Sequence, residues 1–158
     1  MSKVSIILPS YNHKKFLKQR LDSIVNQSFT DWELIIIDDC STDGSIEVLT
    51  DFVKLYKDKV KHFILNESNS GSGYTSWKKG IELANTEYVW IAETDDYSEV
   101  IFLEETIKIL EQNKECALVF CNSNYVDEQN IFLYDSSSRT KHLKVEKVSL
   151  VFLKMSFY

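Results

Sequence analysis

Cysteine is scarce in this chain and follows no pairing pattern. The three cysteines, Cys40, Cys116 and Cys121, include no C-x-x-C pair, and their odd number argues against a disulfide framework. A zinc site is disfavoured by the same lack of paired spacing. We therefore expect three partly buried free thiols in a protein of the reducing cytoplasm.

Long apolar runs and an excess of basic charge are also missing. No stretch reaches the roughly 18 uninterrupted apolar residues that a membrane span needs, and the apolar run at 4–9 is too short for a signal peptide. The chain has 18 Lys and Arg against 24 Asp and Glu, and its net charge of -6 disfavours nucleic-acid binding. We expect a cytoplasmic protein, and peripheral association with the inner face of the membrane stays open.

Glycine is absent from the first strand–helix turn, "PSYNHKKF" at 9–16, and the first glycine of the chain is Gly44. Loops that cradle phosphate with backbone N–H groups need glycine for close approach. A Rossmann dehydrogenase and a P-loop NTPase are therefore disfavoured.

What the chain does have is a regular alternation of two apolar patterns. With 158 residues, 44% of them hydrophobic, it is long enough for one domain with a core. Continuous apolar runs predict strands, and apolar residues at helical spacing predict helices between them. The strands are expected at 4–9, 32–38, 62–65, 88–92 and 117–121, and the helices at 12–27 with Asn12 as N-cap, at 45–56, through Trp77, Ile81 and Ala84, and at 99–112. This order predicts an α/β fold with a mostly parallel sheet and helices on both faces.

The pattern weakens after residue 122. The sequence there is typical of an irregular strand, a turn and a polar loop, followed by a helix within 144–158. The chain stops on the apolar residues "MSFY". Because exposed aromatics at the end of a domain are unusual, we expect the natural protein to continue beyond Tyr158.

Carboxylates gather where the predicted strands end. Asp38 and Asp39 follow the second strand, and Asp95 and Asp96 follow the fourth, while Tyr11 follows the first. The carboxyl ends of parallel strands share one edge of a sheet, which is where such sheets bind ligands. Clustered carboxylates repel a diphosphate unless Mg²⁺ or Mn²⁺ bridges them, so the pattern favours a nucleoside diphosphate bound through a metal.

Structural interpretations of the same residues stay open. Asp96 or Ser98 would serve as cap of the helix at 99–112, and Asp43 and Ser45 would form a turn and a cap. Asp38 would be held by loop N–H groups. Tyr11 and Trp77 would be ordinary packed aromatics.

Taken together, the chain resembles the family 2 glycosyltransferases of the GT-A fold. The resemblance lies in "VSIILPSYNHKKFLKQRLDSIVNQSFTDWELIIIDDCSTDGS" (4–45) and "NSGSGYTSWKKGIELANTEYVWIAETDD" (69–96), and it covers about residues 3 to 125. It implies a Rossmann-like GT-A sheet, truncated at its C-terminus. Residues 1–125 would form the nucleotide-sugar-binding half, and 126–158 the incomplete start of the acceptor-side half.

The resemblance also implies roles for single residues. Pro9 and Tyr11 would form the base pocket, and Asp39 would accept the imide N–H of the base, which favours UDP or dTDP over GDP. Asp95 would contact the ribose or the sugar. Asp96 would be the main ligand of Mn²⁺ or Mg²⁺, with Glu93 or Asp95 as further candidates.

The activity implied is inverting, metal-dependent transfer of a sugar from a nucleoside-diphosphate sugar to a hydroxyl of an acceptor saccharide or lipid-linked saccharide, in the synthesis of surface polysaccharides. Trp77 stands where many relatives have an arginine that contacts the diphosphate, and Lys78 or Lys79 is the candidate replacement. The catalytic base is left unassigned, because Asp127 and Glu128 are more typical of a surface turn. A non-catalytic nucleotide-sugar-binding module is the main alternative. A nucleotidyltransferase is disfavoured, because no glycine-rich basic loop is present.

Overall fold

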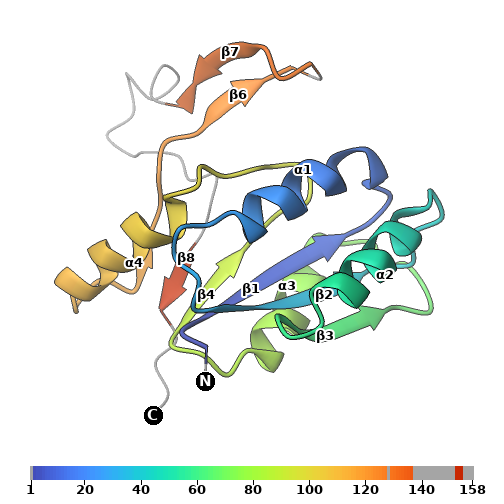
Figure 1. Ribbon diagram of the computed structural model, residues 1–158, viewed down its shortest axis with the longest axis horizontal. Coiled ribbons are helices and arrows are strands. Elements are labelled where there is room, and N and C mark those ends of the chain that lie inside the picture. The colour runs from blue at the N-terminus through green and yellow to red at the C-terminus, as the bar shows by residue number, and fades with distance from the viewer. Residues whose placement is uncertain (1, 128, 137–151, 155–158) are drawn as a thin grey trace.

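The computed structural model describes residues 2–127, 129–136 and 152–154. Strands and helices alternate through the first half of the chain (Figure 1). The elements are β1 (Val4–Ser10), α1 (Lys14–Val25), β2 (Trp32–Asp38), α2 (Ser45–Leu55), β3 (Val60–Leu65), α3 (Gly73–Leu83), β4 (Tyr88–Ile91), α4 (Phe102–Gln112), β5 (Leu118–Val119), β6 (Asn124–Val126), β7 (Phe132–Asp135) and β8 (Phe152–Lys154).

The main sheet has the strand order β3-β2-β1-β4-β8-β5. β1 pairs in parallel with β2 and with β4, and β2 pairs in parallel with β3. This confirms the predicted mostly parallel sheet. β8 runs antiparallel to both of its neighbours, β4 and β5. The short strands β6 and β7 form a separate antiparallel pair.

The C-terminal prediction is wrong for residues 152–154. A helix was expected within 144–158, but residues 152–154 form the strand β8. A short apolar run fits a helix or a strand equally well, and here the free edge of β4 provides a partner that is remote in sequence. The other residues of that predicted helix lie outside the described residues. β5, expected over 117–121, contains two residues.

Two apolar clusters fill the space on either side of the sheet. β1 illustrates the alternation, because Ile6 and Leu8 belong to one cluster and Ile7 to the other. α1, α2 and α4 pack on the first side, and α3 with the following Ala84 packs on the second. The predicted arrangement of helices on both faces is therefore confirmed.

α3 lies very close to β1 at Gly80. A Cβ atom added at this glycine would stand 2.4 Å from Ile7 Cγ2, well inside van der Waals contact. Only glycine permits this approach of the helix to the sheet.

The N-terminus of α1 is not capped in the way that the sequence suggested. Asn12 has a φ of 53°, and its Oδ1 accepts the backbone N–H of Thr42 at 2.8 Å. α1 begins instead at Lys14, whose N–H donates to Asp43 Oδ2 at 2.9 Å. Asp43 Oδ1 accepts the N–H of Ser45 at 2.9 Å, so one carboxylate caps the first turns of α1 and α2. The turn-and-cap interpretation of Asp43 is confirmed, while Asn12 as N-cap is wrong.

α4 begins at Phe102, three residues later than expected, and neither Asp96 nor Ser98 caps it. The side chain that reaches its first turn comes from the segment after α1, because Gln27 Oε1 accepts the N–H of Leu103 at 2.9 Å. Ser98 Oγ instead accepts a hydrogen bond from Gln27 Nε2 at 3.2 Å.

The three cysteines are free and partly buried, as expected. Among the described residues, no helix combines the length and the apolar character needed to cross a membrane.

Candidate functional site

The ends of β1, β2 and β4 are joined by hydrogen bonds at one edge of the sheet. Ser10 is in register with Asp38, and the next residue, Asp39, donates its N–H to Ser10 O at 2.8 Å. Thr94, after β4, donates its hydroxyl hydrogen to the carbonyl oxygen of Pro9. The strand ends that the sequence marked as polar are therefore neighbours in space.

A cavity of about 300 Å³ opens at this edge. Its lining comes from the ends of β1, β2 and β4, from the loop before α3 and from the start of α3. It consists of Pro9, Ser10, Tyr11, His13, Asp39, Asn69, Gly71, Ser72, Gly73, Ser76 and Glu93. Four of the predicted site residues, Pro9, Tyr11, Asp39 and Glu93, thus share one cavity. We call it the β1–β2 cavity.

Tyr11 is 44% exposed. The interpretation of Tyr11 as an ordinary packed aromatic is therefore wrong, because a ring so exposed is available to a planar ligand.

Asp39 is buried and held by three hydrogen bonds. Its Oδ1 accepts Asn66 Nδ2 at 2.6 Å, and its Oδ2 accepts the N–H and the hydroxyl of Ser70 at 2.9 and 2.8 Å. Burial raises the pKa of Asp39, but these hydrogen bonds and the charge of Lys79 outweigh it and hold the pKa below its ordinary value. A carboxylate has about four acceptor positions, so one remains for a ligand.

The neighbouring Asp38 has a structural role. It is fully buried, and its two oxygens accept the N–H of Ser41 at 2.8 Å and the Ser41 hydroxyl at 2.7 Å. The structural interpretation of Asp38 is confirmed, and Asp38 is not among the residues that line the β1–β2 cavity.

The residues 93–98, which we call the acidic loop, leave the end of β4. The Asp96 N–H donates to Glu93 O at 3.3 Å and closes a turn. Asp95 is exposed, while Glu93 and Asp96 are partly buried. Asp95 and Asp96 line a second cavity, of about 460 Å³, between the acidic loop, α4 and the segment 119–126.

Burial raises the pKa of both Glu93 and Asp96 above the ordinary values. The charge of Asp95 adds to this effect, and the charge of Arg20 opposes it for both residues. A positive charge nearby lowers the pKa of both carboxylates, and Arg20 supplies one.

Within the described residues, no group of three or more His, Cys, Asp or Glu side chains is arranged to hold a metal ion. Mg²⁺ and Mn²⁺ do not require such a group, because they are commonly bound by one or two carboxylates together with phosphate oxygens and water. The acidic loop carries carboxylate oxygens, from Glu93, Asp95 and Asp96, of the type that these cations take as ligands.

Comparisons with known proteins decide the family. Residues 5–157 match the sequence profile described as Glycosyl transferase family 2. The chain belongs to this family. Glycosyltransferase GlyG of Streptococcus pneumoniae is 30% identical over 133 residues, which cover 83% of this chain and 43% of GlyG. Poly(ribitol-phosphate) beta-N-acetylglucosaminyltransferase TarS of Staphylococcus aureus is 29% identical over 122 residues, which cover 75% of this chain and 21% of TarS.

Solved structures agree with this assignment and with the GT-A fold. S. aureus TarS in complex with UDP has a TM-score of 0.65 and 26% identity, over 75% of this chain and 34% of that one. A mannosyltransferase of Pyrobaculum calidifontis, solved with GDP-Man and Mn²⁺, has a TM-score of 0.75 and 19% identity, over 96% of this chain and 44% of that one, and shows the fold alone. The chain spans about half the length of the curated relatives it matches, from 45% to 51% for three of them.

Trp77 is the residue that stands where many family 2 members have an arginine. It packs against the apolar cluster between α3 and the sheet, and its ring contacts that of Tyr74 with a centroid distance of 4.8 Å. The interpretation of Trp77 as a core residue is confirmed. Lys78 is exposed, and its Nζ lies 3.9 Å from Glu82 Oε1. Lys79 Nζ instead donates to Asn66 Oδ1 at 2.9 Å. Lys79 therefore supports the side chain that binds Asp39.

Asp127 forms a turn. Its Oδ1 accepts the N–H groups of Gln129 and Ile131, both at 2.9 Å, at the bend between β6 and β7. This confirms the turn interpretation of Asp127. Glu128 lies outside the described residues.

Arg20 was not predicted from the sequence. This residue has no exposed surface, and it lies on the buried side of α1 with Leu17, Leu21 and Ile24. Its Nε donates to Glu93 O at 2.6 Å, at the start of the acidic loop. The signal was present, because an arginine at helical spacing within an apolar face must find a partner in the interior.

Proposed function

We propose that this chain is the donor-binding part of a glycosyltransferase that uses a nucleoside-diphosphate sugar. The observation that carries the proposal is that Tyr11, Asp39 and Glu93 share one cavity at the carboxyl edge of a parallel sheet. Residues 1–125 would form the donor half, and 126–158 would begin the acceptor-side half.

The base pocket would use the exposed ring of Tyr11 as a stacking surface, with Pro9 as a wall. The remaining acceptor position of Asp39 would take the imide N–H of uracil or thymine, so we infer UDP or dTDP rather than GDP as the carrier. The complexes of S. aureus TarS with UDP and UDP-GlcNAc support this choice.

The divalent cation, Mn²⁺ or Mg²⁺, would be held by Asp96, with Glu93 or Asp95 as an additional ligand, and by the diphosphate. When bound, it would stabilise the negative charge of the departing diphosphate. Asp95, which is exposed, would reach the ribose or the sugar.

Transfer would be a single displacement with inversion. An acceptor hydroxyl, deprotonated by a carboxylate base, attacks the anomeric carbon as the bond to the nucleoside diphosphate breaks. The base stays unassigned, because Asp127 is engaged in its turn. This observation favours one alternative, a nucleotide-sugar-binding module without catalysis.

The acceptor would be a saccharide or lipid-linked saccharide of a cell-surface polymer, met in the cytoplasm or at the inner face of the membrane. The relatives that act on poly(ribitol-phosphate) support a polymer of this kind.

Titration calorimetry with UDP, dTDP and GDP, each with and without Mn²⁺, tests the proposal. We expect UDP or dTDP to bind more tightly than GDP, and Mn²⁺ to tighten the binding by at least about tenfold, or 1.4 kcal/mol. Equal binding of the three, or no effect of Mn²⁺, contradicts the proposal. Release or transfer of sugar from the preferred donor separates the enzyme from the binding module.

A further inference from the structure

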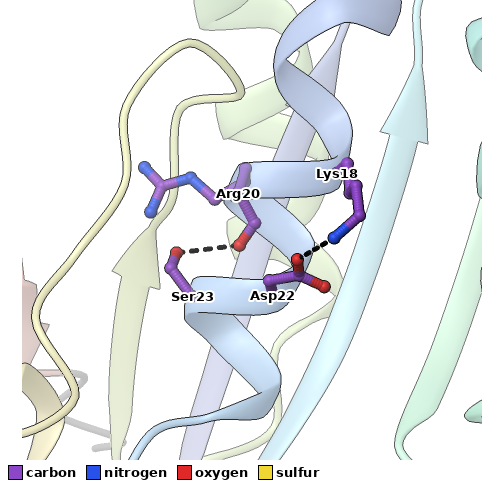
Figure 2. Close-up of polar contacts among 4 residues, drawn as sticks. All are labelled: Lys18, Arg20, Asp22 and Ser23. Atoms are coloured by element: carbon purple, nitrogen blue, oxygen red, sulfur yellow. Dashed lines mark hydrogen bonds and ion pairs between the residues drawn. The ribbon is translucent and has the colours of Figure 1, made fainter. Parts of the chain in front are cut away.

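Arg20 lies behind the acidic loop, and the proposed function gives it no role. Figure 2 shows its side chain extending from α1 toward β4 and the segment that follows it, which have the yellow-green and yellow colours of Figure 1. Its Nε binds Glu93 O at 2.6 Å, and its guanidinium carbon lies 5.4 Å from the centroid of the Trp90 ring on β4. One side chain therefore contacts both the end of β4 and the start of the acidic loop.

The two terminal nitrogens of Arg20 have no hydrogen-bond partner within the part of the chain that the structure describes. Leaving a buried donor unpaired costs about 1–3 kcal/mol, and more when it is charged. A cation without exposed surface is tolerated only where negative charge faces it. The carboxylates that act on Arg20 electrostatically are Asp96, Glu93 and Asp95, in that order.

The charge of Arg20 survives its burial. Desolvation lowers the pKa of the guanidinium, the three carboxylates raise it, and the result is about 10. Arg20 is therefore positively charged at neutral pH.

We propose that Arg20 is the positioning residue of the acidic loop. It holds the backbone at Glu93, and from the interior side it compensates the negative charge of the loop carboxylates. The part of this inference that concerns the cation rests on the proposed function. With the loop held from behind, Asp96 and its neighbours are kept in place to share a divalent ion with the diphosphate. Lysine would carry the same charge, but it lacks the planar guanidinium whose Nε–H group donates to Glu93 O.

The test compares three variants of the full chain. Arg20→Met removes the charge and the donors, and Arg20→Lys keeps only the charge. Lys18→Met is the matched control, because Lys18 lies on the same helix but is exposed and pairs with Asp22 at 2.5 Å (Figure 2). Circular dichroism establishes that each variant is folded.

The first measurement is amide hydrogen exchange without ligand. We expect Arg20→Met to speed exchange in the acidic loop by about tenfold, with β2 changed by less than about twofold, because local opening is separable from global unfolding. Arg20→Lys is expected between Arg20→Met and the wild type, and Lys18→Met at the wild-type value. A uniform increase in β2 and the acidic loop, or no increase in the loop, overturns the proposal.

The second measurement compares two quantities for each variant. One is the gain in UDP affinity on adding Mn²⁺, and the other is the affinity for uridine, which has no diphosphate. We expect Arg20→Met to lower the gain by about tenfold, as the loss of residues that orient metal ligands commonly does, with uridine binding within about twofold of the wild type. Arg20→Lys should recover part of the gain. Equal losses for uridine and for the Mn²⁺ gain, or an unchanged gain, overturn the cation part of the inference.

The two measurements also separate this inference from the proposed function. If the wild type shows no Mn²⁺ gain while Arg20→Met still loosens the acidic loop, the proposed function fails and the positioning role stands. If Arg20→Met does not fold, Arg20→Lys decides: faster exchange confined to the loop supports the proposal, and unchanged exchange overturns it.

Discussion

The side-chain oxygen of Gln27 accepts the backbone N–H of Leu103, on the first turn of α4, at 2.9 Å. The amide nitrogen of the same side chain donates to Glu99 O at 2.8 Å and to Ser98 Oγ at 3.2 Å. Gln27 thus joins the segment after α1 to the end of the acidic loop and to the beginning of α4. It is buried, so these contacts are shielded from water.

Replacing Gln27 by leucine should lower the free energy of unfolding by about 2–3 kcal/mol, because the Leu103 N–H and the Glu99 carbonyl lose their buried partner. Chemical denaturation measures this change. Gln19→Ala on α1 is the control, since Gln19 makes one long contact, 3.3 Å to Asn130, and should change stability by less than about 0.5 kcal/mol. Equal effects of the two substitutions would contradict the role of Gln27.

Gly80→Ala should destabilise the chain by about 1–3 kcal/mol, because the new Cβ would overlap Ile7 Cγ2 in a packed interior. Gly73→Ala in the same helix is the control, since its Cβ would meet nothing nearer than Trp77 Nε1 at 4.0 Å. Thermal unfolding compares the two. Adding Ile7→Val to Gly80→Ala is expected to restore part of the loss, and a Gly80→Ala variant as stable as the wild type would rule out the close contact.

Asp39→Asn should weaken uridine binding by about tenfold to a hundredfold, because hydrogen bonds to a charged group contribute about 1.5–3 kcal/mol. It also places an NH₂ group among the donors of Asn66 and Ser70, so the free energy of unfolding should fall. Calorimetry and chemical denaturation measure the two effects. Asp51→Asn, at an exposed residue of α2, should change neither.

The pKa of Asp39 gives this effect a pH dependence. Because the folded pKa lies below the unfolded value, Asp39 stabilises the fold above its unfolded pKa, and this contribution is lost as the pH falls through the folded pKa. The stability difference between the wild type and Asp39→Asn should therefore shrink on acidification. A difference that does not change between neutral and acidic pH would contradict the charged state of Asp39.

Asp96→Asn should have opposite effects on stability and on binding. Burial raises the pKa of Asp96 in the folded chain, so this carboxylate costs stability at neutral pH, and its contribution improves as the pH falls through the raised pKa. We expect the variant to be slightly more stable without ligand, because the relief of the burial cost of Asp96 exceeds the counter-charge that Arg20 loses. The same variant should lose the Mn²⁺ gain in UDP binding.

Asp58→Asn, at an exposed residue, is the control for this trade-off and should leave both quantities unchanged. A less stable Asp96→Asn chain would show that the charged carboxylate is already well compensated. A chain that keeps its full Mn²⁺ gain would remove Asp96 from the proposed metal site.

Where the fold was predicted well, the information was local. The bounds of β2 were predicted as 32–38 because a continuous apolar run ends sharply at Asp38. β8 was missed because its short apolar segment becomes a strand only through the edge of β4, more than sixty residues earlier in the chain. Asn12 was misassigned for a related reason, since the competing cap, Asp43, comes from the next strand–helix turn.

The candidate site shows the same division. Tyr11, Asp39 and Glu93 follow strand ends directly, so the parallel topology alone brings them together. Arg20 on α1 and Gln27 in the segment after it contact the acidic loop at Glu93 and Ser98, which lie 73 and 71 residues away in sequence. Residue type could flag them as unusual in an interior, but only the packing identifies their partners.

The place of β8 between β4 and β5 has a consequence for biosynthesis. β1, β2 and β3 can assemble once residue 65 has emerged from the ribosome, whereas β4 keeps an open row of N–H and C=O groups until residue 154 is available. Nascent chains that have passed β4 but not residue 154 expose an unpaired edge strand, to which another polypeptide can add a strand. A chaperone that covers this edge would keep such chains from pairing with a neighbour before β8 is available.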